Sequence, residues 1–201
     1  MADVLLEPYG GQVLGMSVAA TTRLIAVLAF GTLVGFGLAS RVLGRGGSPM
    51  GLAAGGGLVG VGAFALVVAS ASIGTPFALA AATLVAGFGA GLFSHGTLTA
   101  TMRAAPKDQV GLALGAWGAV QTTAAGIAIA IGGIVRDVIV AADSAGDAAT
   151  PYLVVFSVEI VLLIGALVVA IPLLRREAAA TLAEPRLAEA TVQAACRDNL
   201  S

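Results

Sequence analysis

The stretch GFGAGLFSHGTLTATMRAAPKDQVGLALGAWGAVQTTAAGIAIAIGGIVRD, residues Gly87–Asp137, decides the fold class of this chain. It contains two glycine-rich apolar segments joined by the short charged turn RAAPKDQ. About 20 mostly apolar residues are enough for a helix to cross a membrane, so the stretch predicts a hairpin of two membrane helices. It also places His95, Trp117 and Gln121 inside those helices. Polar groups at that depth are costly and require a structural or functional reason.

The composition of the whole chain agrees with a membrane protein. Of its 201 residues, 58% are hydrophobic and 10% are charged, whereas soluble domains carry about 25% charged residues. The sequence has no Lys/Arg-rich run and no basic patch with interleaved aromatics, so we expect no nucleic-acid binding. Cys196 is the only cysteine, which excludes an intrachain disulfide and a CxxC metal or redox site. We therefore predict no protein-bound metal.

Five segments reach membrane-spanning length, and a shorter one precedes them. The expected spans are residues 17–40, 51–72, 76–101, 110–135 and 152–174. Residues 3–16 are too short to span and are interrupted by a proline and two glycines. We therefore predict an all-α membrane domain over residues 1–174, with five full helices and a partial first one. A polar tail over residues 175–201 is expected to form a surface helix broken at Pro185.

The positions of Lys and Arg predict how the chain crosses the membrane. One side receives Arg41, Arg45, Arg103, Lys107, Arg175 and Arg176. The other side receives mainly acids, and only Arg136 departs from the pattern. Because basic loops stay in the cytoplasm, this distribution places the N-terminus outside and the C-terminus in the cytoplasm. An odd number of spans independently places the two termini on opposite sides of the membrane.

Glycine is abundant, with 28 residues, and much of it recurs at four-residue spacing inside the expected spans. The pairs are Gly31/Gly35, Gly51/Gly55, Gly56/Gly60, Gly87/Gly91 and Gly111/Gly115. Small residues at this spacing let two helix backbones approach closely. As a set, the pairs predict tight helix–helix contacts.

The first basic loop resembles a motif of the major facilitator superfamily. Gly37-Leu-Ala-Ser-Arg41-Val-Leu-Gly44-Arg45 is similar to G-x-x-x-D-x-x-G-R, although Arg41 replaces the usual acid. The glycines would permit a tight turn, and an arginine could cap the carbonyls of a neighbouring helix. A plain basic turn explains the same residues. In that superfamily the motif follows the second helix of each six-helix half, so this chain is expected to form one C-terminal half-bundle.

Three segments resemble the PucC/LhaA proteins, the bacteriochlorophyll-delivery branch of that superfamily in purple phototrophic bacteria. They are DVLLEPYGGQVLGMSV (3–18), GLFSHGTLTATM (91–102) and GLALGAWGAVQTTAAGIAIAIGGIVRD (111–137). The resemblance implies a non-enzymatic assembly factor for light-harvesting complexes in the photosynthetic inner membrane. Its cargo would be bacteriochlorophyll and its partners antenna polypeptides. Two alternatives remain open: a small-solute transporter, supported by fold alone, and a half-transporter fragment that needs a partner half-bundle.

His95 is the sharpest candidate for pigment binding. The residues on its i, i+4 line are small or polar, namely Gly87, Gly91 and Thr99, so the imidazole lies on a stripe that could face a groove. A neutral imidazole nitrogen is a good axial ligand for the magnesium of a chlorin, the cargo that the resemblance implies. The alternative is a structural hydrogen bond to a neighbouring helix backbone or to hydroxyls such as those of Ser94 and Thr97.

Trp117 and Gln121 lie one turn apart on the following helix, at a depth similar to that of His95. The tryptophan ring could stack on a macrocycle, and the amide could bond to a carbonyl. The plainer explanation is that Trp117 fills a gap left by glycines while Gln121 bonds across helices. Such membrane hydrogen bonds average about 0.6 kcal/mol.

Arg23 and Glu159 are the two charges expected inside the membrane. Each lies roughly 10 Å from the outer end of its span at ~1.5 Å per residue. Pairing would relieve the cost of two isolated charges, so we predict an ion pair between them. The alternatives are a proton or substrate site, or an Arg23 side chain that extends outward to the interface.

Overall fold

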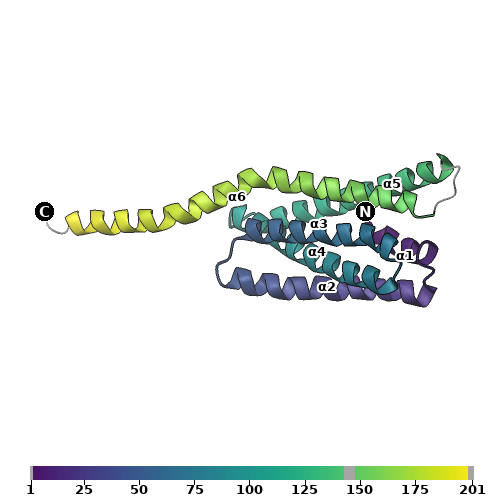
Figure 1. Ribbon diagram of the computed structural model, residues 1–201. Helices are drawn as coiled ribbons and strands as arrows, with labels where there is room; N and C mark the ends of the chain where they lie inside the picture. The colour runs from purple at the N-terminus through teal and green to yellow at the C-terminus, as the bar shows by residue number, and fades with distance from the viewer. Residues whose placement is uncertain (1, 143–147, 199–201) are drawn as a thin grey trace.

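The computed structural model describes residues 2–142 and 148–198. These residues form six α-helices and the turns between them (Figure 1). In chain order they are α1 (Ala2–Gln12), α2 (Val18–Gly44), α3 (Pro49–Ile73), α4 (Pro76–Ala104), α5 (Val110–Ala142) and α6 (Thr150–Asp198). Helices α2 to α6 are each long and apolar enough to cross a membrane, and α1 is not among them. The predicted all-α membrane fold, with five full helices and a shorter first one, is confirmed.

Local sequence signals set the helix boundaries. The hydroxyl of Ser48 precedes Pro49 at the start of α3 and accepts a hydrogen bond of 2.8 Å from the backbone N–H of Gly51. Proline suits a first helical turn because its missing N–H needs no partner there, and Pro76 begins α4 in the same way. Helix α3 ends at Gly74, whose φ of 67° lies in the left-handed region that favours glycine.

Helices α2 and α4 pack with their backbones in direct contact. Four glycines make this contact: Gly31 and Gly35 of α2, and Gly87 and Gly91 of α4. A Cβ atom built on Gly35 would lie 2.5 Å from the carbonyl oxygen of Phe88. A Cβ on Gly87 would overlap the carbonyl oxygen of Leu28. No other residue fits these positions without moving one helix away from the other.

Helix α4 uses its other side to contact α3 in a similar way. A Cβ on Gly56 would lie 2.5 Å from the backbone nitrogen of Phe93, and one on Gly89 would lie 3.0 Å from that of Gly60. The predicted close contacts are thus confirmed for Gly31/Gly35, Gly56/Gly60 and Gly87/Gly91. They are not found for Gly51/Gly55 or Gly111/Gly115, where a Cβ would meet only the hydroxyl side chain of Ser48 or open space. Helix α5 is largely exposed, and Gly132 is its buried residue.

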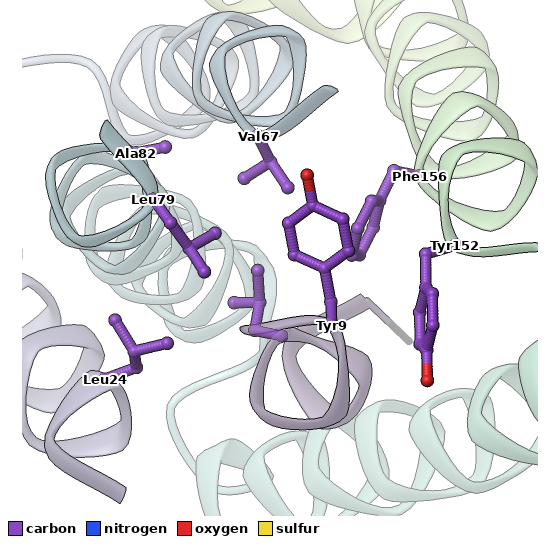
Figure 2. Packing of buried hydrophobic residues seen from close by; sticks show 8 residues of the cluster. Tyr9, Leu24, Val67, Leu79, Ala82, Tyr152 and Phe156 are labelled. Carbon is purple, nitrogen blue, oxygen red and sulfur yellow. The ribbon is translucent and has the colours of Figure 1, made fainter. Parts of the chain in front are cut away.

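Helix α1 closes one end of the bundle, which we call the α1 end. Its Tyr9 is fully buried among side chains from α2, α3, α4 and α6 (Figure 2). The Tyr9 ring meets the Phe156 ring edge-on, with centroids 5.3 Å apart and planes at 89°. Its hydroxyl lies 3.2 Å from that of Ser70 on α3. The short α1 helix therefore contributes one of the two buried tyrosines of this core. Aromatic rings bury a large area and favour such edge-to-face contacts.

The turn between α2 and α3 corrects our expectation for the loop motif. We expected Gly37 and Gly44 to permit the turn, but α2 runs through Gly37 and ends at Gly44. The chain turns instead at Arg45 and at Gly46, whose φ is 84°. The helix continues because an internal glycine costs only about 1 kcal/mol. The side chains of Arg41 and Arg45 are exposed and make no hydrogen bond or ion pair with the described residues.

Helix α6 differs from the expected division into a span and a broken tail. It runs from Thr150 to Asp198 as one helix of 49 residues and is not interrupted at Pro185. Its last part projects beyond the ends of the other helices (Figure 1). One proline removes a single backbone donor, and the flanking sequence is rich in Ala, Leu, Glu and Arg, all strong helix formers.

Candidate functional site

His95 lies on α4, with its ring close to Phe36 of α2. The two ring centroids are 5.7 Å apart, and the planes are tilted by 49°. The side chain is half-buried. The hydrogen bond expected from a structural histidine is not found, because the Thr97 hydroxyl donates to the carbonyls of Phe93 and Ser94 instead. Within the described residues neither imidazole nitrogen has a hydrogen-bond partner. The ring is therefore held by packing while its nitrogens remain available to a ligand.

Trp117 and Gln121 are half-buried on α5. Neither makes a hydrogen bond or ring contact with His95, and the amide of Gln121 bonds to no residue of the described chain. The explanation that Gln121 bonds across helices is therefore not supported by the structure. A joint pigment site formed by Trp117, Gln121 and His95 remains a prediction.

Arg23 and Glu159 do not form the predicted ion pair. The Arg23 side chain is exposed on α2 and has no partner among the described residues. Glu159 points inward from α6, and its Oε2 atom is buried without a hydrogen-bond partner in the described chain. Similar position along the helices did not imply proximity, because Arg23 is exposed on α2 whereas Glu159 of α6 lines a cavity. The alternative, an Arg23 side chain that extends outward to the interface, stays a prediction.

The buried Glu159 oxygen lies in the wall of a cavity of about 330 Å³ between five of the helices. Its lining is mostly apolar and includes Phe64 of α3, Phe93 of α4 and Leu163 of α6. Ser94 also lines this cavity, and its hydroxyl forms no hydrogen bond with a described residue. The volume falls in the range of small-molecule sites, about 300–1,000 Å³. Sequence spacing could not reveal this cavity, because it is built from helices distant in the chain.

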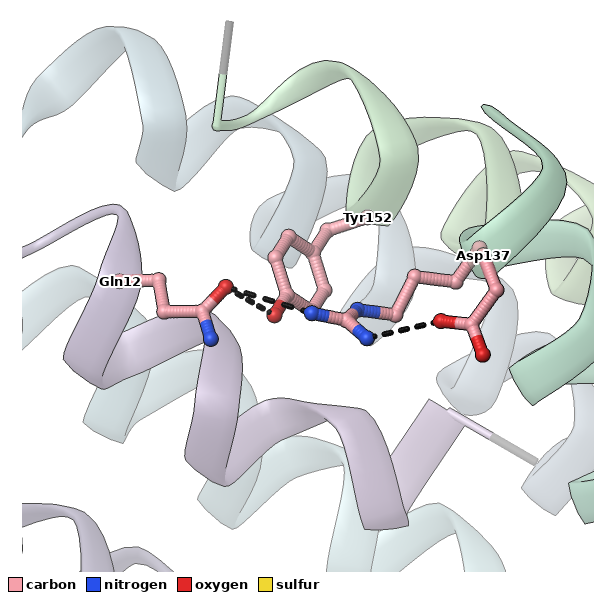
Figure 3. A network of polar contacts seen from close by, with 4 residues as sticks. Gln12, Asp137 and Tyr152 are labelled. Atoms are coloured by element: carbon pink, nitrogen blue, oxygen red, sulfur yellow. Dashed lines mark hydrogen bonds and ion pairs between the residues drawn. The ribbon is translucent and has the colours of Figure 1, made fainter. Parts of the chain in front are cut away.

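A polar cluster at the α1 end joins α1, α5 and α6. The Tyr152 hydroxyl donates a 2.7 Å hydrogen bond to Gln12 Oε1, as Figure 3 shows. Arg136 lies over the Tyr152 ring at 5.4 Å from its centroid and forms a 2.9 Å ion pair with Asp137. The sequence did contain a signal for this cluster, because Arg136 was the one basic residue that departed from the charge pattern.

A second polar contact, at the opposite end of the bundle, was not expected from sequence. Glu177 belongs to the segment predicted as a polar tail with a surface helix, and its Oε2 accepts a 2.6 Å hydrogen bond from the Ser48 hydroxyl. The same oxygen accepts a 3.2 Å hydrogen bond from the backbone N–H of Met50. A carboxylate is favoured at this place because the first turn of α3 presents unpaired N–H groups and a positive dipole end.

No three His, Cys, Asp or Glu side chains of the described residues gather in a way that could hold a metal ion. A single axial ligand to a metal carried inside a macrocycle is a different requirement. It needs only one nitrogen, and the role of His95 as that ligand stays a prediction.

The chain resembles known proteins along most of its length. The model of the PUCC protein family matches residues 1–178. Protein PucC of Rhodovulum sulfidophilum is 64% identical over 139 residues, which cover 69% of this chain and 31% of that protein. Protein PucC of Cereibacter sphaeroides is 55% identical over 182 residues, which cover 90% of this chain and 40% of that protein. A Rhodobacter capsulatus protein described as an uncharacterized protein in the puhA-bchM intergenic region is 46% identical over 181 residues.

This chain spans about a third to two fifths of the length of the curated relatives it matches. No solved structure matches it. The major-facilitator arrangement of its helices therefore stays a prediction, whereas the family match covers more than half of the chain. The chain belongs to the PUCC protein family.

Proposed function

We propose that this chain assists the assembly of photosynthetic light-harvesting complexes in the bacterial inner membrane by holding bacteriochlorophyll for transfer to antenna polypeptides. The family match and the high identity to two PucC proteins support a role connected with photosynthetic complexes. The proposed role requires binding and release of a pigment and no covalent chemistry.

His95 is the single observation that carries the pigment proposal. Its imidazole nitrogens have no partner within the described chain, and its ring is positioned by Phe36. The magnesium of a bacteriochlorin accepts one axial nitrogen ligand, and a neutral imidazole supplies it without placing a charge in the membrane. Trp117 and Gln121 would then provide a flat ring and a hydrogen bond on the neighbouring helix. In this proposal, α4 supplies the ligand and α5 supplies the contacts to the macrocycle.

We further propose that the N-terminus is periplasmic and that the C-terminus is cytoplasmic. The basic turns after α2 and α4 and the pair Arg175–Arg176 favour this orientation. The exposed face of α5, with open space around Gly111 and Gly115, would meet lipid or a partner half-bundle. Close approach of another helix there needs no rearrangement of side chains.

The test uses this chain expressed in a phototrophic host that lacks its own PucC relatives. The protein purified in mild detergent should carry a near-infrared absorbance band from bound pigment. His95→Phe preserves the ring beside Phe36 but removes the nitrogen ligand, so the band should fall at least several-fold. Thr99→Val, one turn away on the same face, should retain the band.

Two results would contradict the proposal. An unchanged band in His95→Phe would remove His95 from the pigment site. A colourless wild-type protein that moves a small solute across vesicles would favour the transporter alternative instead.

A further inference from the structure

The Glu159 cavity adjoins a second hollow, which is lined by α3, α4 and α6. The second hollow has a volume of about 140 Å³ and shares Gly57, Phe93 and Leu163 with the first. On α6 the combined lining extends from Glu159 to Leu173. This is roughly 21 Å at ~1.5 Å per residue, or about two thirds of a ~30 Å hydrocarbon core. We call the combined space the α3–α4–α6 trough, and its lining extends along the helices.

The trough is apolar along its length, and its unused polar groups lie in the first cavity. The second hollow is lined by aliphatic and aromatic side chains together with Thr97, whose hydroxyl already bonds to backbone carbonyls. In the first cavity, Thr32 also bonds to its own helix. Glu159 Oε2 and the Ser94 hydroxyl are left without partners in the described chain. A buried acceptor without a partner costs free energy that a suitable ligand would recover.

These observations together select one kind of occupant. A carboxyl oxygen requires a hydrogen-bond donor, and a free serine hydroxyl can donate to an acceptor. A hydroxyl head group is both donor and acceptor, whereas an ammonium only donates and an ester carbonyl only accepts. An apolar lining that extends this far along the helices, around volumes of about 330 and 140 Å³, fits one hydrocarbon chain better than a broad ring system.

We propose that the α3–α4–α6 trough binds a single-chain amphiphile with a hydroxyl head, such as a long-chain or prenyl alcohol, with its head hydrogen-bonded to Glu159. His95 lines neither cavity. The trough is therefore a site separate from the proposed pigment ligand and does not depend on the pigment proposal.

The experiment places the purified full chain in lipid nanodiscs with a hexadecanol probe that carries a photoreactive diazirine in mid-chain. After illumination, mass spectrometry should find the label on α3, α4 and α6 residues of the trough. Unlabelled hexadecanol and hexadecyl methyl ether then compete with the probe. The ether has the same chain but no donor, so the alcohol should compete about tenfold better, as expected for one hydrogen bond to a buried carboxyl.

Two substitutions locate the head group and the chain. Glu159→Leu should remove the preference for alcohol over ether, while Asp108→Asn, an acid in the exposed turn after α4, should keep it. Ala90→Phe fills the first cavity from its exposed edge and should abolish trough labelling. Ala29→Phe on the exposed face of α2 is its matched control and should not.

If Glu159→Leu does not fold, two other variants still test the proposal. Glu159→Gln keeps the size and an acceptor oxygen, so it should retain much of the preference, and Ala90→Phe tests the trough independently. Equal competition by alcohol and ether in the wild-type protein would overturn the proposal. Label spread evenly over the lipid-facing sides of α2 and α5 would do so as well.

Discussion

The Tyr152 hydroxyl donates a 2.7 Å hydrogen bond to Gln12 Oε1 and so joins the first turn of α6 to the last residue of α1. The two residues are 140 positions apart in the chain. The guanidinium of Arg136, which lies over the Tyr152 ring, adds α5 to the same contact. Arg136 also donates a 3.5 Å hydrogen bond to Gln12 Oε1, so side chains of α1, α5 and α6 meet in one polar cluster beside the Tyr9 ring contacts.

Removing this hydroxyl should weaken the α1 end without disturbing its packing. Tyr152→Phe keeps the ring beside Tyr9 and below Arg136 and should lower the free energy of unfolding by about 1 kcal/mol. Reversible unfolding in mixed micelles measures the change. Ser157→Ala is the control, because that hydroxyl bonds only within its own helix. Equal stability of Tyr152→Phe and wild type would show that the bond contributes nothing.

The contact between α2 and α4 should tolerate no added carbon at its centre. Gly87→Ala places a methyl group against the Leu28 carbonyl and should cost about 1–3 kcal/mol through overpacking. Gly115→Ala meets open space and should be neutral or stabilising by up to about 1 kcal/mol, since alanine favours the helix. Thermal unfolding of both variants in the same detergent decides the matter. A Gly87→Ala protein as stable as Gly115→Ala would contradict this packing.

The Ser48–Glu177 contact should be visible as energetic coupling. Ser48→Ala removes the helix cap of α3 and the partner of Glu177, so we expect a loss of about 1 kcal/mol. Glu177→Gln weakens the same contact by removing the charge. If the two residues act together, the double variant should lose less than the sum of the single losses. Strict additivity in this double-mutant cycle would mean that the tail does not hold α3.

Charge reversal should not rescue Arg23 and Glu159 variants. Because Arg23 is exposed and Glu159 faces the cavity, Arg23→Glu combined with Glu159→Arg should be no more stable than the worse single variant. Expression level and unfolding of the three proteins in membranes provide the comparison. Recovery of stability in the double variant would instead support the ion pair predicted from the sequence.

The number of membrane helices and their approximate positions could be predicted from sequence because they depend on local composition. The close glycine contacts were predicted only in part. Gly31/Gly35 and Gly87/Gly91 have the same four-residue spacing as Gly111/Gly115, yet only the first two pairs face another backbone. Spacing shows that a helix has a smooth face, whereas the neighbour of that face depends on how the whole bundle packs.

The polar residues show the same limit more sharply. Arg23 and Glu159 share a depth, but rotation about each helix axis decides whether two side chains meet, and depth carries no information about it. The Tyr152–Gln12 bond and the Glu177–Ser48 bond each join opposite parts of the sequence. Neither has a local signature. His95 stands out in the sequence because a lone histidine in an apolar helix is unusual by itself, and its role stays a prediction.

The length of α6 has a mechanical consequence. Its 49 residues extend roughly 74 Å at ~1.5 Å per residue, more than twice the ~30 Å thickness of a hydrocarbon core. Tyr152 and Phe156, near one end, are wedged against Tyr9, while the other end projects past the bundle. A continuous helix transmits tilt and rotation along its axis. A protein that binds the projecting end of α6 could therefore change the packing of Tyr152 and Phe156 against Tyr9 at the other end.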